Sequence, residues 1–145
     1  CIGHQNVALI VPRDHPLAER DSVDLAQLDG ERFIAYDHQC KIRDHIDEIF
    51  ESVGVRPKIV SETSHDTIIY GSVAARFGVA LVPQPLSMRY NNVKVLSIEN
   101  DIPRRDIFLI WKQVRYLSPV VKNFRDFVVK KDLALNDFRE SIGQL

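Results

Sequence analysis

The sequence of 145 residues lacks any apolar run that approaches the ~20 residues of a membrane-spanning helix. Its first residues, CIGHQNVALIV, have no basic segment ahead of the apolar run, so they do not resemble a secretory leader. An initiator methionine is also absent, which suggests a fragment. Cysteine is scarce: Cys1 and Cys40 have no metal-type spacing, and we expect reduced thiols in a cytosolic protein.

Signatures of enzymes and metal sites are lacking as well. None of the five histidines forms an HExxH pair, and no GxSxG, GxGxxG or P-loop motif occurs. Four acidic side chains within residues 44–51 could suggest paired catalytic carboxylates, but their helical spacing places them on a solvated face. We therefore expect no catalytic residue, no metal site, no cofactor and no enzymatic activity. The net charge of -1 argues against a free-standing nucleic-acid binder, because phosphate contacts need clustered Lys and Arg.

The residues that are present are typical of one globular α/β domain. Hydrophobic residues make up 45% of the chain and charged residues 27%. Because strand–helix–strand units recur along the first 83 residues, a largely parallel sheet is predicted. Strands are expected at residues 7–11, 32–36, 58–62, 79–82, 93–98 and 106–112. Helices are expected at residues 24–28 (one turn), 42–53, 64–77 and 118–128, and apolar residues at 135–145 suggest a terminal helix.

The central stretch, residues 61–83, combines a polar loop, a capped helix and a buried strand. Ser64 is the predicted N-cap, since its hydroxyl can accept a hydrogen bond from the first helical turn. Gly78 is expected to end the helix in a left-handed conformation. The following residues 79–82 are all apolar, as a strand covered on both faces requires. The predicted apolar stripe of the helix consists of Ile69, Val73 and Phe77.

The helix predicted for residues 42–53 is the clearest one in the sequence. Arg43 lies off its apolar face and can pair with Asp47 one turn later, a contact worth only ~0.2–0.5 kcal/mol. Gly54 is expected to end the helix. The predicted apolar face consists of Ile42, Ile46, Ile49, Phe50 and Val53.

Polar residues follow two of the predicted strands, and open α/β sheets bind ligands at strand carboxyl ends. One set follows residues 32–36, and the other is at the start of the central helix, where free N–H groups suit a carboxylate. Ser64 is the preferred single candidate. The candidate binding residues are Tyr36, Asp37, Thr63, Ser64, His65 and Thr67.

Each of these residues also has a purely structural interpretation. Ser64 could be a plain helix cap, and a cap can bind a ligand as well. His65 is expected to be an exposed residue at the helix start, although a histidine near neutral pH can offer a donor or a cation. Tyr36 fits an aromatic residue at the edge of the core, and Cys40 fits a half-buried thiol without a redox role.

Five segments together resemble the effector-binding (regulatory) domain of LysR-type transcriptional regulators. They are VALIVPRDHPLA, VDLAQLDGERFIAYD, IRDHIDEIFESVGVRPKIVSE, SVAARFGVALVPQPL and RRDIFLIWKQVRYLSPVVKNFRDFV, in matching order and spacing. HPLA and VAARFGVALVP are the most diagnostic of them. The family usually has glycine and leucine where this chain has Arg76 and Phe77.

The resemblance implies an α/β, periplasmic-binding-protein-like (type 2) fold of two subdomains. One subdomain would be complete, at about residues 13–98. Residues 1–12 and 99–131 would supply the crossover strands and part of the other, and residues 132–145 would form a C-terminal helical tail. The family's winged helix-turn-helix and the first half of the first subdomain are absent from this sequence.

The function implied is ligand sensing by a cytoplasmic bacterial transcription factor. A small, anionic effector would bind between the subdomains and alter the geometry of a homodimer or tetramer. DNA would be contacted only through the absent N-terminal domain, and no membrane partner is expected. The alternative is a solute-binding protein of a transporter, which shares the fold type, and an enzyme on the same scaffold is a further rival.

Overall fold

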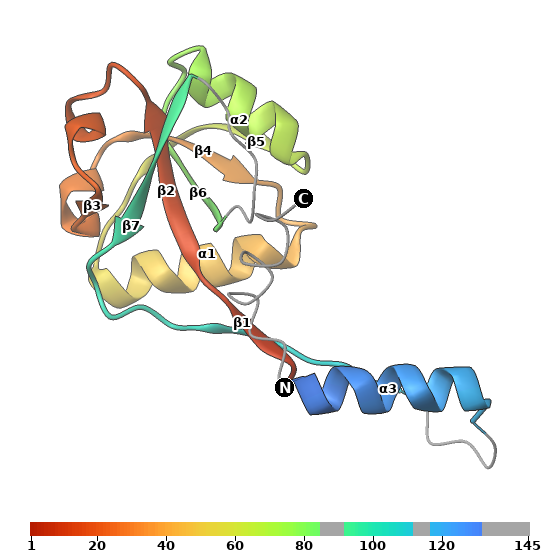
Figure 1. Ribbon diagram of the computed structural model, residues 1–145. Helices are drawn as coiled ribbons and strands as arrows, with labels where there is room; N and C mark the ends of the chain where they lie inside the picture. The colour runs from red at the N-terminus through yellow and green to blue at the C-terminus, as the bar shows by residue number, and fades with distance from the viewer. Residues whose placement is uncertain (85–91, 112–116, 132–145) are drawn as a thin grey trace. The chain divides into compact units, whose positions relative to one another are not determined.

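The computed structural model describes residues 1–84, 92–111 and 117–131. Its contacts divide into a larger unit, residues 6–103, and a smaller unit, residues 1–5 with the chain from Arg104 onward. Each unit contains β-strands and at least one α-helix (Figure 1). The terminal helix predicted near residues 135–145 lies outside the described residues.

The larger unit is built on β2 (Val7–Pro12), in which every residue is buried. This strand lies between β6 and β7 and pairs antiparallel with both (Figure 1). A short strand, β3, pairs parallel with β7 and completes the four-stranded sheet. The bounds of these neighbours are Ser22–Val23 for β3, Ala80–Pro83 for β6 and Val93–Ile98 for β7.

A second, parallel pair consists of β4 (Arg32–Tyr36) and β5 (Lys58–Thr63), joined by α1 (Lys41–Val53). A single parallel bridge, Phe33 to Val79, links β4 to the residue before β6. The prediction of a largely parallel sheet is therefore wrong for the strands around β2. One helix joins β4 to β5 and another, at Asp66–Ala74, joins β5 to β6, so these strands run in one direction, as crossover helices require. The strand β2 runs against them, since it pairs antiparallel with β6.

The helix α1 is amphipathic as predicted. Ile46 and Ile49 are fully buried on the core side, and Phe50 meets Phe33 edge-on with ring centroids 5.1 Å apart. Each such side chain contributes about 1.5–3 kcal/mol when it leaves water. Gly54 ends the helix at a φ of 70°, and its N–H donates to the carbonyls of Phe50 and Glu51.

The start of the central helix differs from the prediction. This helix, α2, spans Asp66–Ala74, and its N-cap residue is His65 rather than Ser64. The carbonyl of His65 accepts from the amides of Ile68 and Ile69, which begins the helical hydrogen-bond pattern one residue after Ser64. The Ser64 side chain is exposed and makes no cap hydrogen bond within the described chain.

The end of α2 also differs. Arg76, and not Gly78, takes the left-handed conformation, with a φ of 63°. The helix therefore stops before Phe77, which is 58% exposed and is not part of the buried stripe. Gly78 is needed for another reason: a Cβ there would lie 2.5 Å from the carbonyl oxygen of Arg32. The close approach of the backbone at residue 78 to β4 thus leaves room only for glycine.

Two 3-10 helices complete the larger unit, η1 (Pro16–Glu19) and η2 (Leu25–Leu28). The predicted turn at residues 24–28 is confirmed, with the Asp24 carboxylate accepting from the amide of Ala26 at 2.9 Å. Leu25 and Leu28 of η2 are fully buried.

The smaller unit contains an antiparallel pair, β1 (Gly3–Gln5) with β8 (Arg105–Ile107), and α3 (Pro119–Lys131). The buried strand predicted for residues 106–112 is wrong: β8 is short, and Ile110 is 88% exposed. The predicted start of α3 is correct, since the Ser118 hydroxyl accepts from the amide of Val121 at 3.4 Å. Among the described residues, Val128 is the buried apolar side chain of α3, and no helix is long and apolar enough to cross a membrane.

Candidate functional site

The fold brings the two predicted sets of polar residues together. Tyr36 and Thr63 are register partners at the carboxyl ends of the parallel strands β4 and β5. One residue further along, the amide of Asp37 donates to the carbonyl of Thr63 at 3.0 Å. The start of α2 follows directly after Thr63, so both sets lie at one edge of the sheet.

Tyr36 forms the closest link between the two sets. Its ring is buried, and its hydroxyl donates to the Asp66 carboxylate at 2.7 Å. Burial, followed by this hydrogen bond, raises the pKa of the Tyr36 phenol far above its ordinary value. Tyr36 is therefore a core-edge aromatic residue whose hydroxyl fixes the first turn of α2.

The first turn of α2 offers polar groups without partners within the described chain. The amides of Asp66 and Thr67 make no hydrogen bond there, and the side chains of Ser64, His65 and Thr67 are exposed. Thr63 is half-buried, and its hydroxyl accepts from the amide of His65 at 3.3 Å. A helix start with free N–H groups and neighbouring hydroxyls is a suitable place for an anionic group.

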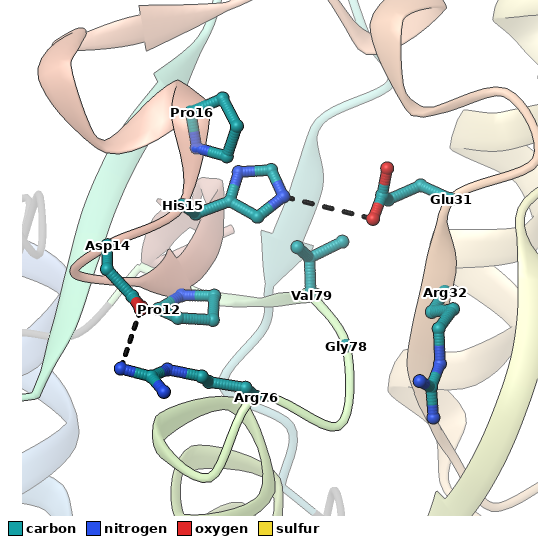
Figure 2. A pocket seen from close by; sticks show the side chains of 9 residues that line it. All are labelled: Pro12, Asp14, His15, Pro16, Glu31, Arg32, Arg76, Gly78 and Val79. Atoms are coloured by element: carbon teal, nitrogen blue, oxygen red, sulfur yellow. Dashed lines mark ion pairs between the residues drawn. The ribbon is translucent and has the colours of Figure 1, made fainter.

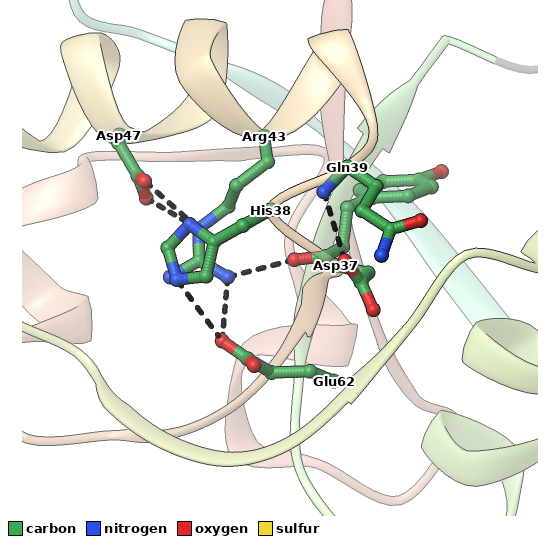
Figure 3. Close-up of polar contacts among 7 residues, drawn as sticks. Asp37, His38, Gln39, Arg43, Asp47 and Glu62 are labelled. Atoms are coloured by element: carbon green, nitrogen blue, oxygen red, sulfur yellow. Dashed lines mark hydrogen bonds and ion pairs between the residues drawn. The ribbon is translucent and has the colours of Figure 1, made fainter.

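Arg43 was not among the predicted site residues, yet it organises this edge. Its side chain, predicted to lie off the apolar face, belongs to a residue only 4% exposed. One guanidinium nitrogen donates to the backbone oxygen of Tyr36 and to the Glu62 carboxylate, both at 2.7 Å (Figure 3). The Nε atom donates to both carboxylate oxygens of Asp47, at 2.8 and 2.9 Å. Arg43 thus ties α1 to the carboxyl ends of β4 and β5.

The contacts of Arg43 compensate for the burial of its charge. Burial alone lowers the pKa of a guanidinium, but the hydrogen bonds to Glu62 and Asp47 outweigh it and leave the pKa of Arg43 raised. The spacing of Arg43 with Ile46 and Phe50 placed it at the border of the apolar face. A cation at that border, one turn before Asp47, was the feature of the sequence that could have identified Arg43 as a site residue.

The loop between β4 and α1 is shaped by its own polar groups. The Asp37 carboxylate accepts from the amide of Gln39 at 2.8 Å, and the Asp37 carbonyl accepts from that of Cys40. The His38 ring is exposed, with Nε2 3.8 Å from a Glu62 carboxylate oxygen (Figure 3). Cys40 is a half-buried free thiol at the N-cap of α1, as interpreted from the sequence.

A possible set of metal ligands lies in the smaller unit. Ligand atoms of Cys1, His4 and Asp106 lie within 4.8 Å of one another, and all three residues are exposed. His4 Nδ1 and an Asp106 carboxylate oxygen are 2.6 Å apart, which is a hydrogen-bond distance. Since His4 and Asp106 already satisfy each other, these residues do not by themselves require a metal.

The sequence matches the family described as the LysR substrate binding domain over residues 1–132. The chain belongs to this family. The family relationship agrees with the resemblance predicted from the five sequence segments.

Individual relatives support the same assignment. The chain is 32% identical over 125 residues to the uncharacterized HTH-type transcriptional regulator YybE of Bacillus subtilis (strain 168). That match covers 86% of this chain and 43% of YybE, so the chain spans less than half of this curated relative.

Solved structures of the family confirm the fold. The effector binding domain of QuiR in complex with shikimate is 32% identical and superposes with a TM-score of 0.80, covering 90% of this chain and 63% of that one. The regulatory domain of Synechocystis PCC6803 CcmR in complex with 2-PG is 19% identical with a TM-score of 0.72, covering 91% and 65%. The predicted α/β, periplasmic-binding-protein-like (type 2) fold is therefore correct.

Proposed function

We propose that the chain is the ligand-sensing part of a LysR-type transcription regulator and that a small anionic effector binds at the carboxyl ends of β4 and β5. The observation that carries this proposal is the pairing of Tyr36 with Thr63 beside the start of α2. The unpartnered amides of Asp66 and Thr67, with the hydroxyls of Thr63 and Ser64, supply donors for a carboxylate.

The domain division that we propose is the one that the family implies. The second subdomain comprises about residues 13–98, which fall within the compact unit of residues 6–103. Residues 1–12 and 99–131 then belong to the crossovers and to part of the first subdomain, with residues 132–145 as a tail. The rest of the first subdomain supplies the remaining wall of the effector site.

The output of binding is a change in the arrangement of a homo-oligomer. An effector can shift that arrangement only by binding one state more tightly than another. In the complete regulator, the DNA contacts come from a separate helix-turn-helix domain. The protein acts in the cytoplasm, without enzymatic activity.

The alternative of a transporter's solute-binding protein is less well supported. Curated relatives of this chain are named as transcriptional regulators, including YybE and the Bacillus subtilis transcriptional dual regulator GltC. The upstream sequence distinguishes the two functions: a helix-turn-helix with a linker helix selects the regulator, and a secretory leader selects the transporter protein.

The test replaces Ser64 with tryptophan in the full-length protein. The added ring covers the exposed start of α2, so the affinity for shikimate and for benzoate should fall by about tenfold or more. Isothermal titration calorimetry measures both affinities, and thermal unfolding checks that the fold is intact.

Ser97→Trp is the matched control, because Ser97 is also exposed but lies on β7. Its effector affinity should equal that of the parent protein. Unaltered affinity in Ser64→Trp would disprove the site.

A further inference from the structure

Two short strands that are distant in the sequence bring together three side chains that can ligate a metal. His4 of β1 and Asp106 of β8 are register partners, so their side chains lie on one face of the pair. The amide of Ile2 donates to the carbonyl of Ile107 at 2.7 Å, which extends the pairing towards Cys1. The ligand atoms of Cys1, His4 and Asp106 lie within 4.8 Å of one another.

The prediction of no metal site rested on spacing along the sequence. Cys1 and Cys40 have no metal-type spacing, and no HExxH pair occurs. Asp106 comes 102 positions after His4, and the pairing of β1 with β8 is what places the two side chains next to each other. Within the described part of the chain, these three residues form the one group of three or more such ligands. Local spacing could not reveal it.

The charges of this group suit a divalent cation. A deprotonated Cys1 thiol and the Asp106 carboxylate supply two negative charges, and His4 binds as a neutral imidazole, so a divalent cation gives a neutral complex. Asp106 forms its ion pair with His4, and with no Lys or Arg of the described chain. Arg105, the cation of these two strands, faces the other side by alternation and donates to Gln5 at 3.0 Å.

The cavity in the larger unit offers no comparable charge. Its lining contains two arginines and two carboxylates, and Arg76 is already paired with Asp14 at 2.6 Å (Figure 2). His15 Nε2 lies 3.8 Å from a Glu31 carboxylate oxygen. Opposite charges in this lining compensate each other, whereas the described ligand group of the smaller unit contains a thiol and a carboxylate without a cationic side chain other than a histidine.

The mixture of ligand atoms selects the kind of metal. Thiolate and imidazole suit zinc and similar late transition metals, whereas Mg²⁺ and Ca²⁺ are bound by oxygen atoms. The ligand atoms of a tetrahedral zinc site are roughly 3.3–3.6 Å apart. His4 Nδ1 and the Asp106 oxygen are 2.6 Å apart, so they must separate by about 1 Å to admit the metal. Both side chains are about half exposed, so a packed core does not restrict this rotation.

We propose that Cys1, His4 and Asp106 bind a Zn²⁺ ion through Sγ, Nδ1 and one carboxylate oxygen. Water or a group from outside this set supplies the fourth ligand, as in zinc sites with three protein ligands. The ion displaces the thiol proton into solvent, and the ring proton of His4 is carried by Nε2 instead of Nδ1. Zinc then joins β1 to β8, close to residues 5–6 and 103–104, where the chain passes between the two units.

Titration of the full-length protein with Co²⁺ tests this site, because a thiolate bound to Co²⁺ absorbs in the near ultraviolet. The difference in absorption between the parent protein and Cys1→Ser should saturate at one ion per chain, with a dissociation constant of about 10 μM or less. Zn²⁺ should displace this Co²⁺, and Mg²⁺ should not. His4→Gln and Asp106→Asn should each weaken Co²⁺ binding by about tenfold or more.

Two matched variants keep all three ligands. Cys40→Ser removes the other thiol of this sequence, and Asp101→Asn removes an exposed carboxylate outside the group, so both should bind Co²⁺ as the parent protein does. Far-ultraviolet circular dichroism checks that every variant is folded.

The inference is overturned if Cys1→Ser absorbs as the parent protein does, or if His4→Gln and Asp106→Asn bind Co²⁺ as tightly as the parent. Loss of the band in Cys40→Ser would also overturn it. Effector affinity does not enter these measurements, so the metal site is tested independently of the proposed function.

Discussion

At the scale of single residues, Arg43 shows how a buried charge can be structural. Two carboxylates and a backbone carbonyl surround its guanidinium, so its burial leaves no charge uncompensated. The carboxylates of Asp47 and Glu62 are themselves more than a third exposed, which limits the desolvation cost of the cluster. The arrangement fixes the loop after β4 to α1.

Arg43→Met should therefore destabilise the protein. The variant keeps the length of the side chain but leaves the Tyr36 carbonyl without its donor, at a cost of about 1–3 kcal/mol in the free energy of unfolding. Urea denaturation measures the loss. The control is Lys41→Met, which removes an exposed pair with Asp44 and should change stability by less than about 0.5 kcal/mol. Equal stability of the two variants would contradict this role for Arg43.

Asp24 provides a prediction on pH. Hydrogen bonds from the Ala26 amide and then from the Asn100 side chain lower the pKa of Asp24 below 3.8. Between the folded and the unfolded pKa, Asp24 therefore binds fewer protons in the folded state than in the unfolded state. The ionised Asp24 stabilises the folded protein above about pH 4, and this contribution is lost as the pH falls through the folded pKa. The variant Asp24→Asn keeps a side-chain oxygen that can accept the cap hydrogen bond, but its side chain does not titrate.

The stability of Asp24→Asn should therefore depend less on pH below about 4 than that of the parent protein. Chemical denaturation at a series of acidic pH values compares the two slopes. Parallel curves for the two proteins would show that Asp24 does not contribute to the acid sensitivity.

At the scale of elements, two glycines of the same segment have opposite roles. Gly78 lies against Arg32 so closely that a methyl group would meet backbone atoms, whereas a Cβ at Gly71 would have nothing within 4 Å. Gly71 is inside α2, where glycine is less favourable than alanine by about 0.5–1 kcal/mol. The connection from α2 to β6 thus depends on a close backbone approach.

Gly78→Ala should lower the free energy of unfolding by about 1–3 kcal/mol, because the backbone must move apart. Gly71→Ala should raise it by about 0.5–1 kcal/mol. Thermal and urea denaturation of the two single variants measure these opposite signs. A neutral effect at position 78 would show that the approach to β4 is not tight.

At the scale of the whole molecule, the smaller unit exposes much apolar surface. Phe108, Ile110, Trp111 and Phe124 are each at least half exposed in the described chain. Exposed apolar groups in such number are characteristic of surfaces that other protein segments cover. In the proposed domain division, the rest of the first subdomain covers them.

The chain of 145 residues should accordingly associate in solution. Sedimentation velocity should show species larger than the monomer whose fraction increases with concentration. Ile110→Glu should reduce the association, whereas Phe77→Glu, at an exposed position of the larger unit, should not. A monomer at all concentrations, with full effector affinity, would contradict the proposed division.

The sequence by itself determined the kinds of elements and most of their bounds. Apolar periodicity identified α1 and its burial, β4 was predicted with its observed bounds, and Pro119 after Ser118 located the start of α3. These features depend on local interactions, which neighbouring residues specify. The family was evident for a related reason, since the order and spacing of five segments survive where individual residues differ.

Only the tertiary structure decided how the elements meet. The antiparallel direction of β2, the burial of Arg43 and the position of Gly78 against Arg32 all depend on partners far away in the sequence. The observed start of α2 likewise lies after Ser64, the predicted cap. The Asp66 carboxylate of this helix pairs with Tyr36, thirty positions earlier in the chain. Local patterns encode the periodicity of burial, whereas pairing between distant segments is fixed only when the whole chain packs.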